Sequence, residues 1–466
     1  MRIFERRNIK WIALLGAMLI VGALLIVGLA FSSLPISTMM RSPVMRLATV
    51  LLLLLPVMLI ALLVLVILDS KRTDTTVISV ESVTSLDQAQ AESAPVEGEE
   101  SEENGERAPR FCMLSRIDEN RGVFEQKEFD DDVSLQSFCE NFRNYAAGEL
   151  NLYYDIEDVR RFIAGLAVSP VIILQGMSGT GKTSLAHALG SFLGNTATVI
   201  PVQPMWKERT DLLGYYNEFT KRFNETLLLE KMYEANYSKE IYVTVMDEMN
   251  IARVEYYFAE FLSLLELPNV EERYIDVVSD VWETDPAQLK DGRLRLPPNM
   301  WFIGTANNDD STFAISDKVY DRAMILNLDE KADRFVAAKA RQVRMSADRF
   351  RELIKEATKE YEITKRNLKR LEQLDRYLID HFHITFGNRI MKQICQYIPV
   401  YVSCGGGELE ALDDILSKKI IRKLETQNPV YLRSAAEGLC NYLDELFGVD
   451  RMMLCKNAIH RLERNA

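Results

Sequence analysis

The sequence lacks the residue spacings that mark a metal site or a disulfide framework. Its six cysteines are scattered without a C-x-x-C pair, and its four histidines form no H-E-x-x-H pattern. We therefore expect reduced, structural thiols in a cytosolic domain and predict no zinc site. The chain also lacks an excess of positive charge, since its formal net charge is −13. This excludes a basic footprint over the whole chain and predicts no direct nucleic-acid binding, although a local patch or a partner could still bring the protein to DNA.

Two long uncharged runs lie near the start of the chain, at residues 11–31 and 47–68. Each would form a helix of roughly 30 Å, the thickness of the hydrocarbon core of a membrane. A cleaved signal peptide is the alternative for the first run, but a second run follows it. Six basic residues lie outside the pair, and only Arg41 and Arg46 lie between the two runs; the outer residues are Arg2, Arg6, Arg7, Lys10, Lys71 and Arg72. This bias predicts a two-helix transmembrane hairpin at residues 1–72, in the inner (cytoplasmic) membrane, with the rest of the chain in the cytosol.

The composition changes abruptly after residue 72. Residues 73–109 are rich in Ser, Glu, Thr, Gln and Ala and end in a dense acidic stretch, so they cannot bury enough apolar surface to fold. We interpret them as a flexible acidic linker, with a recruitment tail for a basic partner as the alternative. Residues 110–154 contain more aromatic side chains and are expected to form a short helical lead-in.

The strongest local signal is a glycine-rich segment that follows a short apolar strand. Residues 171–174 are mostly β-branched, which is typical of a buried strand. Residues 176–183 fit the pattern G-x-x-x-x-G-K-[ST] of a phosphate-binding loop, and residues 183–193 are expected to form the helix after it. Backbone N–H groups of such a loop surround the phosphates, aided by the positive end of the helix. The predicted nucleotide-binding residues are Gly176, Met177, Ser178, Gly179, Thr180, Gly181, Lys182, Thr183 and Ser184.

Two carboxylates end a second apolar strand, which begins at residue 241. They are Asp247 and Glu248, and they follow the phosphate loop at the distance along the chain that is typical of nucleotide-hydrolysing sites. Asp247 and Thr183 would hold Mg²⁺, and Lys182 would reach the β- and γ-phosphates. Glu248 would then polarise an attacking water molecule. The pair therefore predicts catalysis as well as binding.

Two further residues complete the predicted site. Asn307 ends the strand at residues 300–307, where its side chain could orient the water; a polar turn at residues 307–310 is the alternative. Arg322 could supply positive charge to the nucleotide of a neighbouring subunit, or could instead pair with a carboxylate such as Asp321. Strands that alternate with helices predict an α/β fold, in which helices sandwich a parallel sheet and the nucleotide lies at the carboxyl ends of the strands.

Together, residues 176–184, 247–253, 304–307 and 318–323 resemble an AAA+ ATPase of the MoxR/McrB/dynein branch. They are most similar to McrB-type motor subunits, and Trp206, residues 211–217 and residues 256–260 add to this likeness. The resemblance implies a P-loop AAA+ core at residues 155–330 and an all-helical lid at residues 331–466. It also implies named roles: Walker A for Lys182 and Thr183, Walker B for Asp247 and Glu248, sensor 1 for Asn307, arginine finger for Arg322 and sensor 2 for Arg389.

The same resemblance implies cofactors and partners. It predicts ATP with Mg²⁺, a hexameric ring, and an effector such as a McrC-like protein in a defence or restriction system. Residues 305–311 lack the Met and Arg of the McrB GTPase signature, so ATP is favoured and GTP remains open. No DNA-reading domain precedes the motor, so recognition of methylated DNA is not carried over. A MoxR-like chaperone for membrane or envelope complexes and a nucleotide-gated scaffold with negligible hydrolysis are the alternatives.

The other elements are expected from pattern alone. Residues 211–217 should form a structured loop and residues 219–229 a short hairpin before a helix. An insert at residues 266–295 should contain a second hairpin. Apolar residues at helical spacing predict helices over most of residues 332–377, 408–425 and 430–447.

Overall fold

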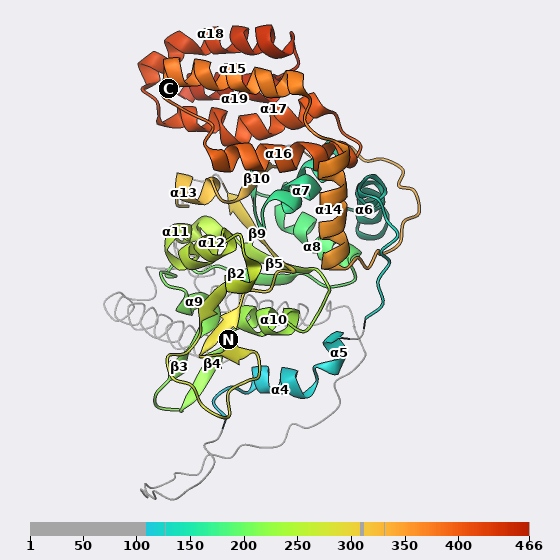
Figure 1. Cartoon of the computed structure of the whole chain (residues 1–466), viewed down its shortest axis with the longest axis vertical. Coiled ribbons are helices and arrows are strands. Elements are labelled where there is room, and N and C mark those ends of the chain that lie inside the picture. Colours follow the sequence, from blue (N-terminus) through green and yellow to red (C-terminus); the bar gives the residue numbers. More distant parts are fainter. Residues whose placement is uncertain (1–108, 126, 308–311, 330, 466) are drawn as a thin grey trace, which may run out of the picture. The chain divides into compact units, whose positions relative to one another are not determined.

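The computed structural model describes residues 109–125, 127–307, 312–329 and 331–465, which belong to one compact unit (Figure 1). Within these residues no helix combines the length and the apolar character that a membrane span requires. The predicted transmembrane hairpin at residues 1–72 lies outside the described residues, and so does the predicted linker apart from its last residue.

A five-stranded parallel sheet forms the centre of the unit. Its strands stand in the order β10 (Met324–Asn327), β1 (Val171–Gly176), β9 (Met300–Asn307), β5 (Tyr242–Asp247) and β2 (Thr198–Pro201). Every neighbouring pair is parallel, so the carboxyl ends of all five strands meet at one edge. The strands read as nearly continuous apolar runs because helices cover both faces. The predicted α/β class is confirmed.

Alternate side chains of the strands enter two separate cores. Ile172 and Leu174 face the first core, which lies under α6 (Leu135–Leu150), α7 (Ile156–Val168) and α8 (Lys182–Phe192). Val171 and Ile173 face the second core, which lies under α10 (Leu227–Ala235), α11 (Val254–Tyr257) and α12 (Ala259–Leu265). This is the two-residue period of a strand buried on both faces. The lead-in adds two short helices, α4 (Met113–Glu119) and α5 (Gly122–Glu125).

Two insertions interrupt the core. The first contains α9 (Thr210–Leu213) and an antiparallel hairpin of β3 (Gly214–Asn217) and β4 (Arg222–Glu225). The prediction of a loop at residues 211–217 is therefore wrong. The hairpin begins at Gly214, earlier than the predicted residues 219–229. Gly214 causes the difference, because its φ of 96° and its closeness to the Asn224 carbonyl let the chain turn directly from helix into strand. The second insertion contains η3 (Val270–Glu272) and a sheet of β6 (Tyr274–Asp276), β8 (Arg293–Arg295) and β7 (Leu289–Lys290), which includes the predicted hairpin.

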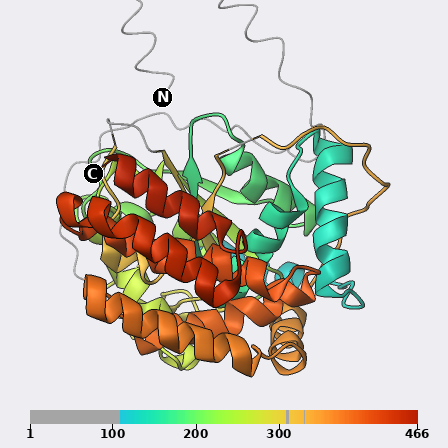
Figure 2. The ribbon, with the colours of Figure 1, turned by 90° about the horizontal axis from the view of Figure 1, so that it is seen from above.

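The C-terminal part is helical, as predicted, from residue 347 onward. It comprises α14 (Ala347–Glu360), α15 (Lys365–Phe382), α16 (Asn388–Ser403), α17 (Glu408–Lys419), η4 (Ile421–Thr426), α18 (Pro429–Phe447) and α19 (Met453–Asn465). Figure 2 shows these orange-to-red helices as one group. Side chains cap several of them, as Ser346 does for α14 and Asn428 for α18.

The expected helix does not extend back to residue 332. Residues 331–345 contain no helix or strand, and their backbone groups bond to other parts of the chain. The Val343 N–H donates to the Phe192 carbonyl, and the Arg344 carbonyl accepts from the Asp130 N–H. These bonds compete with helix formation, so a segment with helical composition instead runs across the core as a connection between core and C-terminal helices.

Candidate active site

The loop between β1 and α8 has the backbone geometry of a phosphate-binding loop. Gly176 adopts a φ of 147°, and a Cβ atom there would lie 2.2 Å from the Leu328 carbonyl oxygen, so a larger residue does not fit. Lys182, the first residue of α8, is buried, and its Nζ donates to the carbonyls of Gly176 at 3.0 Å and Met177 at 2.7 Å. The ammonium group is thereby held inside the curve of the loop, at the amino end of the helix.

A network of hydroxyl groups joins this loop to the end of β5. Thr183 Oγ1 donates to Asp247 Oδ1 at 2.8 Å, and Thr305 Oγ1 donates to the same oxygen at 2.9 Å. Three elements, α8, β5 and β9, thus bring oxygen atoms to one point at the carboxyl edge of the sheet. A hydroxyl and a carboxylate side by side are the protein ligands that Mg²⁺ takes beside nucleotide phosphates, so these residues fit that ion.

Glu248 lies next to this network with its side chain exposed. Its φ is 53°, a left-handed conformation that is uncommon for a residue with a side chain. The turn is held by its own N–H, which donates to Thr305 Oγ1 at 2.8 Å. Thr305 therefore supports both carboxylate residues, Asp247 through its proton and Glu248 through its lone pair. Strain of this kind persists where the surroundings fix it, and it often accompanies function.

Asn307 ends β9, the strand between β1 and β5, and pairs in register with Gly176. It therefore lies between the phosphate loop and the carboxylates, where sequence placed it. Its backbone is fixed by Asn250, a buried residue whose Nδ2 donates to the Asn307 carbonyl at 2.9 Å and to Thr312 Oγ1 at 3.0 Å. The alternative turn at residues 307–310 includes residues outside the described part of the chain.

Sequence reasoning missed the supporting residues Thr305 and Asn250. Both lie within motifs that were identified, at residues 304–307 and 247–253. The signal for Thr305 was its position two residues before Asn307, which puts both side chains on the same face of the strand. For Asn250 the signal was a polar residue in an otherwise apolar turn, where burial requires hydrogen-bond partners.

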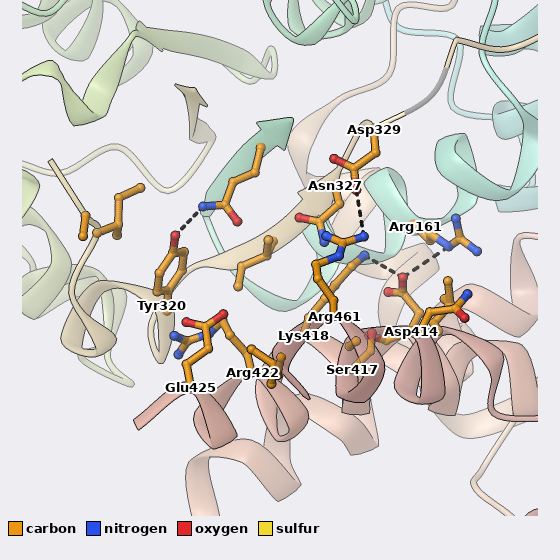
Figure 3. A pocket seen from close by; sticks show the side chains of 18 of the residues that line it. Arg161, Tyr320, Asn327, Asp329, Asp414, Ser417, Lys418, Arg422, Glu425 and Arg461 are labelled. Atoms are coloured by element: carbon orange, nitrogen blue, oxygen red, sulfur yellow. Dashed lines mark hydrogen bonds and ion pairs between the residues drawn. The ribbon is translucent and has the colours of Figure 1, made fainter. Parts of the chain in front are cut away.

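A polar cavity of about 1240 Å³ opens at the same edge of the sheet. The core forms one wall, including Gln175 and Asn307, and helices α17, η4 and α19 form the other. Figure 3 shows two ion pairs that cross from one wall to the other, Arg461 with Asp329 and Arg161 with Asp414. Lys418 also contacts Asp414, but both residues belong to α17. The cavity thus lies between two parts that ion pairs bridge at this edge and that share a hydrophobic core elsewhere.

The most buried of these ion pairs is the one formed by Asp414. Asp414 is 1% exposed and accepts from Lys418 Nζ at 2.6 Å and from Tyr397 Oη at 2.5 Å, while Arg161 Nε lies 3.2 Å away. Burial lowers the pKa of Lys418 and raises that of Tyr397 well above its ordinary value. Removal of one partner would leave an uncompensated buried charge, so this cluster fixes α17 against α7.

The two arginines predicted from sequence lie elsewhere. Arg322 precedes β10, and its carbonyl accepts from Ser169 just before β1, so it belongs to the amino edge of the sheet. β1 has six residues, and at about 3.3 Å per residue the two edges are about 20 Å apart. Arg389, near the start of α16, contacts Glu266, which also contacts Arg322. Both arginines are therefore remote from the phosphate loop of their own chain.

The C-terminal helices also fix the backbone around Arg322. Lys419 of α17 is 2% exposed, and its Nζ donates to the carbonyls of Tyr320, at 2.7 Å, and Ala323. Burial is the largest influence on this amine and lowers its pKa to about 7. The backbone of Arg322 is thus held from both sides, by Lys419 and by Ser169.

Comparison with protein families agrees with this geometry. Residues 171–323 match the AAA domain (dynein-related subfamily), and residues 339–466 match a domain of unknown function (DUF8727). A comparison with curated proteins finds no match.

Two solved structures are similar in part. One is a candidate ATPase from Cytophaga hutchinsonii, with 13% identity over 75% of this chain and 98% of that chain and a TM-score of 0.37. The other is a full-length MCM homolog from Methanopyrus kandleri, with 11% identity over 62% of this chain and 56% of that chain and a TM-score of 0.33.

Proposed function

We propose that this chain, an AAA+ enzyme that hydrolyses nucleoside triphosphates, is a membrane-anchored motor that works as a ring and remodels or activates a partner protein. The enzymatic part rests on the family match of residues 171–323. One observation carries the assignment of the site: Thr183 and Thr305 both donate to Asp247, beside the loop that encloses Lys182. Residues from three motifs meet there, and this supports the assignment.

The chemistry would divide among the residues as follows. The loop amides and Lys182 would bind the β- and γ-phosphates. Thr183 and Asp247 would hold Mg²⁺, which would supply positive charge to the phosphate oxygens. Glu248 accepts a proton from the attacking water, and Asn307 orients that water from the neighbouring strand. Thr305 keeps both carboxylate residues in position.

The distant arginines favour a site that is shared between subunits. Arg322 and Arg389 lie at the edge of the sheet that is about 20 Å from the phosphate loop, as measured along β1. An arginine that stabilises the transferred phosphoryl group must touch it. We therefore infer that both arginines serve the nucleotide of the next subunit. A head-to-tail contact of this kind repeats until it closes into a ring, and six subunits are our expectation.

ATP is the proposed substrate, with GTP as the open alternative. The phosphate loop contacts phosphates and leaves the base unread, so it favours neither nucleotide. ATP is favoured because the sequence at residues 305–311 departs from the McrB GTPase signature. Equilibrium binding and turnover of the two nucleotides, compared on the same preparation, decide between them.

The membrane anchor and the partner are proposals from sequence. The two apolar runs within residues 1–72 would place the motor at the cytosolic face of the inner membrane. The McrB-like motifs favour an effector protein, McrC-like or of another kind, and a role in defence. Work on that partner would come from movement of the C-terminal helices against the core, across the cavity lined by ion pairs.

Turnover by the full chain in detergent tests the enzymatic site. We expect Mg²⁺-dependent hydrolysis that falls by at least about 100-fold in Lys182→Ala and in Glu248→Gln. Unchanged turnover in both variants would overturn the site, and a wild type that binds ATP without turnover would favour the scaffold. Proteins that co-purify with Glu248→Gln from solubilised membranes separate the remaining functions: a partner with nuclease activity supports defence, whereas an envelope complex in assembly supports the chaperone.

A further inference from the structure

Glu266 binds both of the distant arginines at once. Its Oε2 lies 3.0 Å from Arg322 Nε, and its Oε1 lies 2.9 Å from Arg389 Nε. Arg389 Nη2 also donates to Oε2 at 3.2 Å, while Arg322 Nη1 donates to Ser263 Oγ at 3.3 Å. These residues come from the end of α12, the segment before β10 and the start of α16. We call Glu266, Arg322 and Arg389 the Glu266 cluster.

The cluster has an excess of positive charge, because one carboxylate serves two guanidinium groups. Glu266 directly follows α12, where the last carbonyl groups of a helix create a negative potential that also attracts cations. Its two oxygens receive nitrogens in the same way that two oxygens of a phosphate group would. The carboxylate thus occupies the place between the arginines that an external anion would need.

The cluster can be reached from outside. The side chains of Arg322, Glu266 and Arg389 are 28%, 29% and 48% exposed. By contrast, the backbone of Arg322 is held by the buried Lys419 and by Ser169. The guanidinium group of Arg322 can therefore change partner by rotation of its side chain, while its backbone stays in place.

We propose that Glu266 holds both arginines in a resting arrangement, and that the terminal phosphate of a nucleotide bound to the adjacent subunit displaces it. This rests on the proposed function, in which these arginines act on a neighbour. Glu266 then opposes assembly: every interface that forms with bound nucleotide must first break its pairs. A partly exposed ion pair is weak, so the exchange for a multiply charged phosphate is favourable and reversible.

The test measures assembly, with turnover blocked by Glu248→Gln in every preparation. Full chain in detergent is titrated in ATP and Mg²⁺, and its mass distribution is followed by sedimentation. Glu266→Gln keeps the size of the side chain and removes its charge. We expect the protein concentration at half-assembly to fall about threefold to tenfold, and the apparent ATP dissociation constant to fall with it.

The matched control is Glu260→Gln, on the same helix. Glu260 pairs with Arg209 at 2.9 Å and takes no part in the Glu266 cluster. Its neutralisation should therefore leave the protein concentration at half-assembly and the apparent ATP dissociation constant unchanged. When Arg322→Ala is added to Glu266→Gln, the protein concentration at half-assembly should no longer fall. Glu266→Ala, which removes the carboxylate with its stem, should act in the same direction as Glu266→Gln if the protein melts at the same temperature.

An unchanged or higher midpoint in Glu266→Gln would overturn the proposal, since Glu266 would then be a support for the arginines and not their competitor. Failure of the proposed function looks different. In that case Arg322→Ala and Arg389→Ala, made in the otherwise native chain, would leave both assembly and turnover intact. Both the role proposed for Glu266 and the proposed site shared between subunits would then be wrong.

Discussion

At the scale of single residues, Thr305 supports two residues of the proposed site, although it is not itself proposed to bind the nucleotide. Its hydroxyl donates to Asp247 and accepts from the N–H of Glu248, so both carboxylate residues depend on it. The arrangement explains how a residue in the uncommon left-handed conformation, Glu248, is held directly after β5, at the position we propose to be catalytic. It also makes a prediction that does not involve any of the groups proposed to touch the nucleotide.

Thr305→Val should keep the shape of the site and remove both bonds. We expect turnover to fall about tenfold to 100-fold, with a rise in the Mg²⁺ concentration at half-maximal rate, because outer-shell partners orient metal ligands. Thr244→Val is the matched control. Thr244 is buried in β5, and its hydroxyl has no hydrogen-bond partner among the described residues, so its loss should not affect turnover. Equal losses in the two variants would contradict the role of Thr305.

Lys419 gives a prediction about pH. Burial lowers its pKa from an ordinary value of 10.5 to about 7, so between these values the unfolded chain binds more protons at this residue than the folded chain. Its contribution to the free energy of unfolding therefore rises with pH across that window, by up to about 1.4 kcal/mol per pH unit. Below about pH 7 the amine is protonated in both states and the slope disappears.

Urea denaturation of wild type and Lys419→Met at about pH 7.5 and about pH 9 measures this slope. The difference in unfolding free energy between the two proteins should shift in favour of wild type at the higher pH. A constant difference would show that the lysine titrates as it does in water. The charged groups that act on it are Asp321, Arg389, Arg422 and Lys423, and they are the same in both proteins.

At the scale of elements, the strands and the motifs at their ends were predictable from sequence. The phosphate loop, the carboxylates and Asn307 each follow a buried apolar run, and parallel strands bring such ends together. What sequence could not provide was the location of Arg389. Its partner Glu266 lies more than 100 residues earlier, and a contact across that separation leaves no periodic signal. The extended segment at residues 331–345 was missed for a related reason: its hydrogen bonds are made to distant residues.

β9 also depends on the absence of a side chain at one position. A Cβ atom at Gly304 would lie 1.9 Å from Met249 Sδ, and Met249 opens η2 (Met249–Ile251), the turn directly after Glu248. Gly304→Ala should therefore destabilise the protein by about 1–3 kcal/mol and reduce turnover by moving that turn. Gly122→Ala, where nothing lies within 4 Å, is the control and should have little effect.

Thermal or chemical denaturation, read together with turnover, checks this prediction. Met249→Ala in the Gly304→Ala background should recover part of the loss, because it removes the atoms that clash. If Gly304→Ala is as stable and as active as wild type, Met249 adapts freely and β9 does not position the catalytic turn.

At the scale of the whole molecule, the two ends of the central sheet have different roles. The carboxyl edge has the residues that we propose for binding and hydrolysis, and the amino edge has two arginines that contact a single carboxylate. The C-terminal helices contact both regions, through the cavity at one edge and through Lys419 and Arg389 at the other. A movement of these helices would therefore change the protein's own cavity and the arginines offered to a neighbour together.

The most direct test of a shared site is a mixing experiment with two inactive variants of the full chain. Arg322→Ala keeps its own phosphate loop, and Lys182→Ala keeps its arginines, so an interface between the two has one complete site. We predict that each variant alone is inactive and that an equal mixture recovers up to about a quarter of wild-type turnover, the share of such interfaces in a randomly assembled ring. A mixture that stays as inactive as its components, although the subunits assemble together, would contradict the account.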